Sequence, residues 1–193
     1  MTMQKNHFVP VDAEDVYRLL NIGATTLVSA AHDGVSDVMA AAWACALDLT
    51  PCKATVVVDK THFTRPLIEK SGYFALLLPT RAIAKETLYL GSVSKNDELD
   101  KLEKSGAKLF TIDGFEMPMV EGCAAWMIFK VLPEPHNEKT YDLFIGECVG
   151  AWADDRVFKN GHWEFEKADK SMSTLHYVAG GHFYTMGEAI DVE

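Results

Sequence analysis

The chain has 193 residues, 48% of them hydrophobic, which favours one domain (residues 1–193) with ample material for a core. Its 18 basic and 28 acidic residues leave a formal net charge of −10 with no basic block, so binding to nucleic acid is not expected. The sequence shows neither a run of about 18 apolar residues nor the apolar region of a signal peptide, so we expect a cytoplasmic protein without a membrane segment.

The cysteines and histidines do not predict a metal site. The chain contains four cysteines, Cys45, Cys52, Cys123 and Cys148. They form no C-x-x-C pair and no zinc-ligand spacing, and each lies in an apolar segment, so we expect reduced, buried thiols. A redox-active cysteine is the alternative. His176 and His182 have no third ligand at a useful spacing, and we predict no metal ion.

The first predicted elements are a short helix and a hairpin. Asp12 is a candidate N-cap for a helix over residues 12–23, with an apolar stripe at positions 16, 19 and 20. A strand over residues 26–31 then meets Asp33-Gly34. Asp-Gly is a strong hairpin signal because both turn positions tolerate positive φ.

Residues 38–49 allow two interpretations. The segment is dominated by alanine, which has high helix propensity and low strand propensity. The Asp-Gly turn before it and Pro51 after it favour a strand instead. A strand of small side chains has a use, because its backbone can approach a flat ring closely.

A phosphate site is predicted where the next strand ends. The short β-branched strand over residues 54–58 leads to a segment rich in hydroxyls and cations at the start of a helix. The structural alternative to a phosphate site is that Thr61 or Thr64 is simply the N-cap of this helix. Lys60 and Arg65, however, would lie at the positive end of the helix dipole, where cations are unfavourable. A bound phosphate would convert this repulsion into charge-assisted hydrogen bonds.

The rest of the chain alternates between strands and short helices. We expect a strand buried on both faces over 73–78, a helix over 80–90, a short charged helix over 96–104, a strand over 108–112, long strands over 119–132 and 141–152, and a hairpin at residues 160–161. The charged helix is predicted to be a solvated face without chemistry. No dinucleotide fingerprint, Walker loop or nucleophile elbow is present. Many short strands with two hairpin turns predict a mainly antiparallel barrel.

This order of elements resembles the flavin reductase-like family of FMN-binding split β-barrels, which includes the flavoredoxins. Residues 64–74 match the family's helix pattern T-x-x-L-I-x-x-S-G-x-F. Residues 142–149 are similar to its D-H-x-I-x-x-G-E-V strand, and residues 175–184 echo its C-terminal L-x-Y-x-G-G-x-x-Y. The resemblance implies a mainly β (α+β) fold, namely an antiparallel split β-barrel with a few short helices that dimerises. It also favours the strand interpretation of residues 38–49.

The resemblance further implies FMN as cofactor, NAD(P)H as co-substrate, electron transfer to an unidentified acceptor, and a homodimer with the flavin near its interface. No residue is assigned a catalytic role. The cofactor-binding residues fall into a ring-lining, a phosphate-binding and a closing group: Met39, Ala40, Ala41, Ala42 and Trp43; Lys60, Thr61, His62, Thr64 and Arg65; and Tyr177, Gly181 and Tyr184. Cys45, beside the proposed flavin strand, is the first candidate for a redox-active cysteine.

Two residues depart from the family pattern. Asp37 stands where members often carry Asn, and a carboxylate near a reduced, anionic flavin would be unfavourable, so we expect Asp37 to point away from the ring. Leu143 stands where His is common, so any role of that His is in doubt here. The alternatives are a non-enzymatic FMN carrier and a split barrel for another flat cofactor, such as pyridoxal phosphate or haem. Met39 and His182 are weak candidates for a haem ligand.

Overall fold

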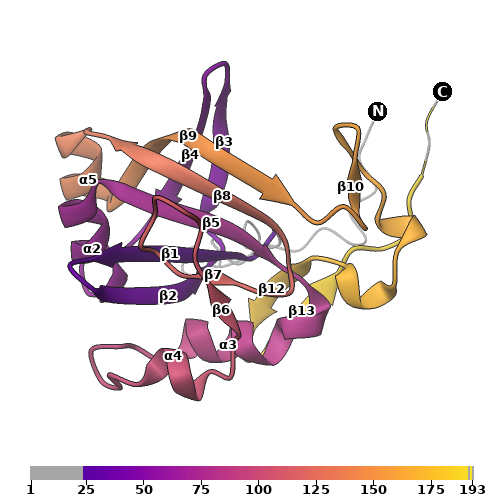
Figure 1. Cartoon of the computed structure of the whole chain (residues 1–193), viewed down its shortest axis with the longest axis horizontal. Coiled ribbons are helices and arrows are strands. Elements are labelled where there is room, and N and C mark those ends of the chain that lie inside the picture. Colours follow the sequence, from indigo (N-terminus) through magenta and orange to yellow (C-terminus); the bar gives the residue numbers. More distant parts are fainter. Residues whose placement is uncertain (1–23, 191, 193) are drawn as a thin grey trace, which may run out of the picture.

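A single large antiparallel sheet dominates the computed structural model, which describes residues 24–190 and 192 (Figure 1). The predicted helix over residues 12–23 lies outside the described residues. The sheet has seven strands in the order β2-β1-β5-β8-β9-β4-β3. They are β1 (Thr26–His32), β2 (Val35–Ala41), β3 (Ala44–Leu49), β4 (Cys52–Val57), β5 (Tyr73–Pro79), β8 (Cys123–Leu132) and β9 (Leu143–Ala153).

Short ribbons and helices complete the described part of the chain. The two-stranded ribbons are β6 (Leu109–Phe110) with β7 (Met119–Val120), β10 (Phe158–Lys159) with β11 (His162–Trp163), and β12 (Leu175–Ala179) with β13 (His182–Thr185). The α-helices are α2 (Thr64–Ser71), α3 (Ala84–Ser92), α4 (Lys101–Lys104) and α5 (Pro135–Tyr141), and the 3-10 turns are η3 (Arg81–Ile83), η4 (Phe165–Lys167) and η5 (Lys170–Met172). The helix predicted over residues 80–90 is thus η3 followed by α3, and the one over residues 96–104 shortens to α4.

The sheet curls because its two edge strands are neighbours in the chain. β2 and β3 lie at opposite edges of the sheet, yet residues 42 and 43 alone connect them. The two edges must therefore approach each other at this connection, which closes the barrel there. The Val57 N–H donates to the Trp43 carbonyl at 3.0 Å and holds the connection against β4. A mostly antiparallel sheet with a few short helices confirms the predicted fold class.

The alanine-rich run forms strands, and its helix interpretation is wrong. It is not one strand but two, because β2 ends at Ala41 and β3 begins at Ala44. β2 pairs with β1, and β3 pairs with β4 on the other side of the split. These ladders override the helix propensity of alanine. The Asp33-Gly34 turn is confirmed, since both residues have positive φ, 51° and 74°.

The other turn signals are confirmed as well. Asn160 and Gly161 have φ values of 51° and 80° and join β10 to β11. The predicted strand over residues 119–132 is interrupted at Gly122, whose φ is 85°, so it divides into β7 and β8. Residues 141–152 correspond to β9, which begins at Leu143 and runs to Ala153.

A glycine lets β9 pack against the aromatic centre of the core. The rings of Phe74 on β5 and Phe129 on β8 stack with their centroids 5.2 Å apart. A Cβ at Gly146 on β9 would lie 2.7 Å from both side chains. Each phenylalanine is at most 2% exposed, so neither ring has open space to move into.

We expect Gly146→Ala to lower the free energy of unfolding by about 1–3 kcal/mol, the cost of overpacking a filled core. Urea unfolding followed by tryptophan fluorescence measures this change. Gly187→Ala is the matched control, because an added Cβ there meets nothing within 4 Å. Equal urea midpoints for the two variants would contradict the close packing at Gly146.

Candidate functional site

An apolar cleft lies where the end of β2 meets α3 and the β12–β13 ribbon. It holds about 400 Å³ of empty space, part of which is open solvent. Its walls are small or apolar side chains with a few hydroxyls: Thr25, Ala40, Ala41, Ala42, Thr87, Leu88, Gly91, Ser92, Tyr177 and Phe183. Two aromatic rings from the ribbon therefore face the alanine backbone of β2 across the cleft.

The cleft has this shape because α3 lies very close to β2. A Cβ at Gly91 on α3 would lie 2.9 Å from the Ala40 Cβ, so glycine is needed for this approach. The ribbon is tied to the same place, because the Tyr177 N–H donates to the Thr25 hydroxyl at 2.9 Å. The Thr25 N–H in turn donates to the Leu175 carbonyl at 2.8 Å. Helix, strand and ribbon thus hold the walls at fixed positions.

A second cleft adjoins the first and holds about 540 Å³ of empty space, part of which is open solvent. We call it the polar cleft because charged side chains are among its lining residues. Gly91 and Ser92 line both clefts, so the two share a wall. The polar cleft gathers hydroxyls, a histidine and two lysines around the start of α2. Its lining residues are Asp37, Met39, His62, Phe63, Thr64, Leu90, Gly91, Ser92, Val93, Ser94, Lys95 and Lys101.

A buried ion pair lies in the polar cleft. The side chains of Lys101 and Asp37 are each 2% exposed, and the Lys101 Nζ lies 3.1 Å from the Asp37 Oδ1. The Thr64 hydroxyl donates to the Asp37 Oδ2 at 2.7 Å. Burial lowers the pKa of Lys101, and the Asp37 carboxylate opposes that shift. The Oδ1 accepts no hydrogen bond of ordinary geometry from the described residues. Helix α4, predicted to be a solvated face, therefore sends a lysine inward, which corrects that prediction.

Lys95 and Asn96 join the two segments that border the polar cleft. The Lys95 ammonium donates to the Ser36 carbonyl at 2.5 Å and lies 5.6 Å from the centre of the Phe63 ring. The Asn96 side-chain amide donates to the Thr61 carbonyl at 2.9 Å. The start of α2 and the segment after α3 are thereby held together, although Thr61 and Asn96 are 35 positions apart in the sequence.

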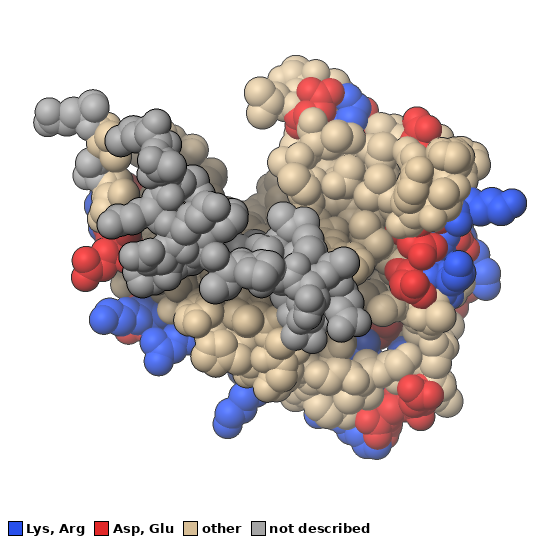
Figure 2. Space-filling model, turned by 180° about the vertical axis from the view of Figure 1, so that it is seen from behind, with Lys and Arg blue, Asp and Glu red and all other residues tan. Residues whose placement is uncertain are grey.

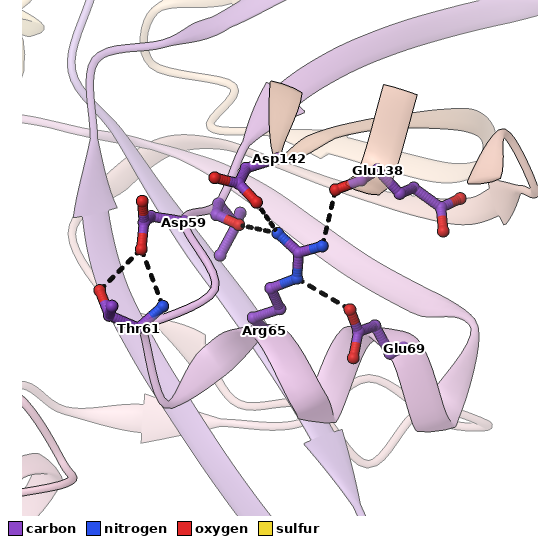
Figure 3. A network of polar contacts seen from close by, with 7 residues as sticks. Asp59, Thr61, Arg65, Glu69, Glu138 and Asp142 are labelled. Atoms are coloured by element: carbon purple, nitrogen blue, oxygen red, sulfur yellow. Dashed lines mark hydrogen bonds and ion pairs between the residues drawn. The ribbon is translucent and has the colours of Figure 1, made fainter. Parts of the chain in front are cut away.

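Arg65 belongs to a structural network outside both clefts (Figure 3). Its Nε donates to Glu69 at 2.8 Å, and one terminal nitrogen donates to the Val58 carbonyl and to Asp142 at 2.9 and 2.5 Å. The other terminal nitrogen donates to the Glu138 carbonyl at 2.7 Å. This guanidinium, 9% exposed, joins α2 to the end of β4 and to α5. The helix-dipole conflict at Arg65 is therefore resolved by carboxylates and carbonyls of the chain itself.

The structure brings together some of the predicted site residues. Ala40, Ala41, Ala42 and Tyr177 line the apolar cleft, and Met39, His62 and Thr64 line the polar one. Gly181 borders the apolar cleft, since a Cβ there would lie 3.4 Å from a methyl group of Leu88. Asp37 is part of the polar cleft and does not line the apolar one.

Trp43, Lys60, Thr61, Arg65 and Tyr184 do not line either cleft. Trp43 and Tyr184 are more than half exposed. The N–H and hydroxyl of Thr61 both donate to Asp59, at 2.8 and 2.7 Å, in the turn that ends β4 (Figure 3). The N-cap interpretation is wrong for α2, whose N-cap is Phe63 and which has no side-chain cap.

The residues after α3 were not among the predicted site residues. Ser92, Ser94 and Lys95 place two hydroxyls and a cation within four positions, which resembles the segment that was singled out before α2. The pattern is therefore a local signal for a second polar segment. Lys101 had no such signal, because its inward direction depends on the position of α4 against Asp37.

The thiols also differ from the prediction. Cys45 and Cys52 are exposed and Cys148 is half-buried, so of the four cysteines Cys123 alone is a fully buried thiol. Burial raises the pKa of Cys123, which keeps it protonated and inert.

Two features of the described residues bear on other classes of function. None of the helices in residues 24–190 is long and apolar enough to cross a bilayer. The same part of the chain holds no group of three or more His, Cys, Asp or Glu side chains arranged to bind a metal ion.

The structure thus combines a split antiparallel barrel with an apolar cleft and an adjoining cleft lined by two lysines. Comparison with known proteins agrees: residues 21–185 match the model of the flavin reductase like domain, and the chain belongs to this family. The resemblance to this family that the sequence shows is thereby confirmed.

Individual relatives cover nearly the whole chain. An FMN-binding domain of a flavin reductases-like enzyme from Shewanella baltica OS155 is 49% identical, with a TM-score of 0.86 over 96% of this chain and 97% of that one. The uncharacterized protein YddH of Escherichia coli (strain K12) is 37% identical over 96% of this chain and 98% of its own length. Flavoredoxin of Desulfovibrio vulgaris (Miyazaki F) shares the fold, with a TM-score of 0.74 and 22% identity over 88% of this chain and 90% of that one.

We expect Arg65→Met to lower the free energy of unfolding by about 3 kcal/mol, because it leaves Asp142 and two carbonyls without their donor. Urea unfolding measures the loss. Glu69→Gln is the matched control, and a change within about 1 kcal/mol is expected because Glu69 is half-exposed. A fully stable Arg65→Met variant would show that the network does not hold α2 in place.

Proposed function

We propose that this protein binds FMN across the two clefts and passes electrons from NAD(P)H through the flavin to an acceptor. The observation that carries the proposal is the shared wall, which places an apolar cleft with an alanine side directly beside a polar cleft with two lysines. One ligand with a flat ring at one end and a phosphate at the other fits this pair. Membership of the flavin reductase-like family supports FMN as that ligand.

The ring would lie against the end of β2. Ala40, Ala41 and Ala42 carry one-carbon side chains, so a flat ring can approach the strand and its N–H and C=O groups. Tyr177 and Phe183 from the ribbon offer aromatic surface on the same cleft. In this proposal Gly181, beside Leu88, keeps the turn of the ribbon from intruding on the cleft.

The phosphate would lie in the polar cleft. Lys95 and Lys101 supply positive charge there, and Ser92, Ser94 and His62 supply donors near the start of α2. This local group offsets a chain that carries a net charge of −10. Of the residues expected to hold the phosphate, His62 keeps that role, and Lys95 and Lys101 take the place of Lys60 and Arg65. Thr64 lines the cleft but donates its hydroxyl proton to Asp37, and Thr61 donates to Asp59 outside the cleft.

Bound FMN would supply the hydride chemistry between the nicotinamide and the acceptor. The chain's own contribution would be binding and orientation. The alanine strand and the ribbon fix the plane of the ring, and the lysines fix its phosphate end. Thr64 and Lys101 hold the Asp37 carboxylate away from the apolar cleft, so its negative charge would not face the ring. No side chain is assigned a catalytic role.

Titration of FMN and riboflavin by flavin fluorescence tests the two clefts separately. We expect Lys95→Met to weaken FMN binding about tenfold or more, because it removes charge-assisted hydrogen bonds to the phosphate. The double variant Asp37→Asn/Lys101→Met removes both members of the buried ion pair and is expected to have the same effect for the same reason. Riboflavin has no phosphate, so its affinity is expected to stay unchanged. Ala41→Leu fills the apolar cleft and is expected to weaken both ligands equally.

Lys60→Met is the matched control for these variants, because Lys60 is exposed and lines neither cleft. It removes the same charge as Lys95→Met and is expected to leave the affinity for FMN unchanged. If Lys60→Met weakened FMN binding and Lys95→Met did not, the phosphate would lie at the turn before α2 and not in the polar cleft.

Steady-state oxidation of NADH and NADPH by the FMN-loaded protein, with free flavin as acceptor, tests the enzymatic part. We expect multiple turnovers that depend on FMN and are abolished by Ala41→Leu. If flavin binds at one site per chain but neither nicotinamide reduces it, the protein is an electron carrier and not an enzyme. Failure of FMN to bind at all would reject both.

A homodimer is the further part of the proposal. The β3–β4 hairpin extends beyond the rest of the sheet (Figure 1). On the face seen in Figure 2, charged side chains lie mainly at the margins, and the surface below the hairpin turn carries few of them. Exposed apolar side chains gather on this hairpin, the connection before it and the neighbouring β9: Trp43, Leu47, Leu49, Val149 and Trp152. A second copy of the chain would remove this apolar surface from water.

A further inference from the structure

Two cysteines face each other across neighbouring strands of the main sheet. β4 begins at Cys52, and Cys148 lies in the middle of β9. In the antiparallel ladder between these strands, Ala54 is opposite Gly146 and Lys53 is opposite Glu147. One further step along the same register brings Cys52 opposite Cys148.

The separation of such a pair suits a disulfide. Directly opposite residues of an antiparallel pair have Cα atoms about 4.5–5.5 Å apart, which lies within the range of about 4.4–6.8 Å found across disulfides. The two thiols interact: burial raises the pKa of Cys148, and the neighbouring Cys52 thiol raises it further. The Cys148 thiol donates to the Gly150 carbonyl at 3.5 Å, which leaves its sulfur available to a second group.

We propose that Cys52 and Cys148 form a reversible intrachain disulfide that joins β4 covalently to β9, with a small disulfide such as oxidised glutathione as the oxidant. This modification site is independent of the flavin, because neither cysteine lines the clefts. It replaces Cys45 as the first candidate for redox chemistry in this chain.

The exchange takes two steps and balances. Cys52 is exposed, so its thiolate attacks one sulfur of the small disulfide, forms a mixed disulfide and releases one glutathione. The Cys148 thiolate then attacks the Cys52 sulfur and releases the second glutathione. Two electrons pass from the protein thiols to the small disulfide, and the two thiol protons end on the released glutathiones. Reduced glutathione or dithiothreitol reverses both steps.

The remaining cysteines lack a partner of this kind. Cys45 is opposite Thr55 in the β3–β4 ladder, and its thiol donates to the Ala46 carbonyl at 3.3 Å. Cys123 is fully buried in the core. On the β3 side of β4, the residue opposite Cys52 is Leu49, so Cys52 has no cysteine neighbour there.

The consequence of the bond follows from the place of β4. This strand is the inner strand of the protruding β3–β4 hairpin, and β9 is its neighbour in the sheet (Figure 1). A bond at Cys52 fixes the hairpin near its turn, at the end farthest from the connection to β2. Oxidation would therefore restrain the part of the hairpin that ladder hydrogen bonds and the Lys53–Asp48 ion pair now hold.

Peptide mapping of the native protein tests the proposal. Trypsin leaves Cys45 and Cys52 together in the peptide of residues 19–53 and leaves Cys148 in residues 140–156, so the experiment uses Cys45→Ser as its background. The protein is incubated with oxidised glutathione, quenched with an alkylating agent and digested without reduction. We expect a crosslinked peptide pair within one chain, the loss of two titratable thiols per chain, and full reversal by dithiothreitol.

Matched variants identify the bond. Cys45→Ser/Cys52→Ser and Cys45→Ser/Cys148→Ser should each lose the crosslink, and the second should stop at one stable glutathione adduct on Cys52. Because burial raises the pKa of Cys148, its thiolate is scarce at neutral pH, and closure is expected to accelerate as the pH rises. A stable adduct on Cys52 in the Cys45→Ser background, a crosslink between chains, or no reaction of Cys52 would each overturn the proposal.

Discussion

The connection between β2 and β3 is the constraint on which the rest of the structure depends. Two residues separate strands that occupy opposite edges of a seven-stranded sheet, so the sheet has to close on itself at that point. The closure places the alanines at the end of β2 beside α3 and the C-terminal ribbon, and both clefts follow from it. Large side chains at residues 40–42 would fill the space where the strand, helix and ribbon meet.

Charge is arranged in two separate ways around α2. Arg65 faces one side of the helix and is satisfied by carboxylates and carbonyls, so it stabilises the fold and has little left for a ligand. Lys101 faces the other side, where a single carboxylate, Asp37, opposes its desolvation. Among the described residues Lys101 thus has one carboxylate partner, whereas Arg65 has two carboxylates and two carbonyls. This difference in pairing is the reason why we assign Arg65 to the fold and propose Lys101 for the phosphate.

Much of the fold could be predicted from the sequence because its signals are local. Asp33-Gly34 and Asn160-Gly161 specify tight turns by their backbone preferences, and both were found where expected. The interruption at residues 42–43 and the role of Lys101 could not be predicted, because each depends on which strand or helix lies nearby in space. The role of Arg65 could not be predicted for the same reason. Its local position suggested a ligand, but Glu138 and Asp142, which are distant in the sequence, give it a structural role.

The C-terminal ribbon contributes to the apolar cleft without being a strand of the main sheet. β12 and β13 pair only with each other among the described strands, and they reach the barrel through contacts such as the Thr25–Tyr177 hydrogen bond. Substitutions at Tyr177 or Phe183 therefore alter the shape of the cleft at little cost to the barrel's own ladders. The hydrogen-bonded ladders of the barrel and the aromatic wall of the cleft are thus separable, so the shape of the cleft can change while the barrel is retained.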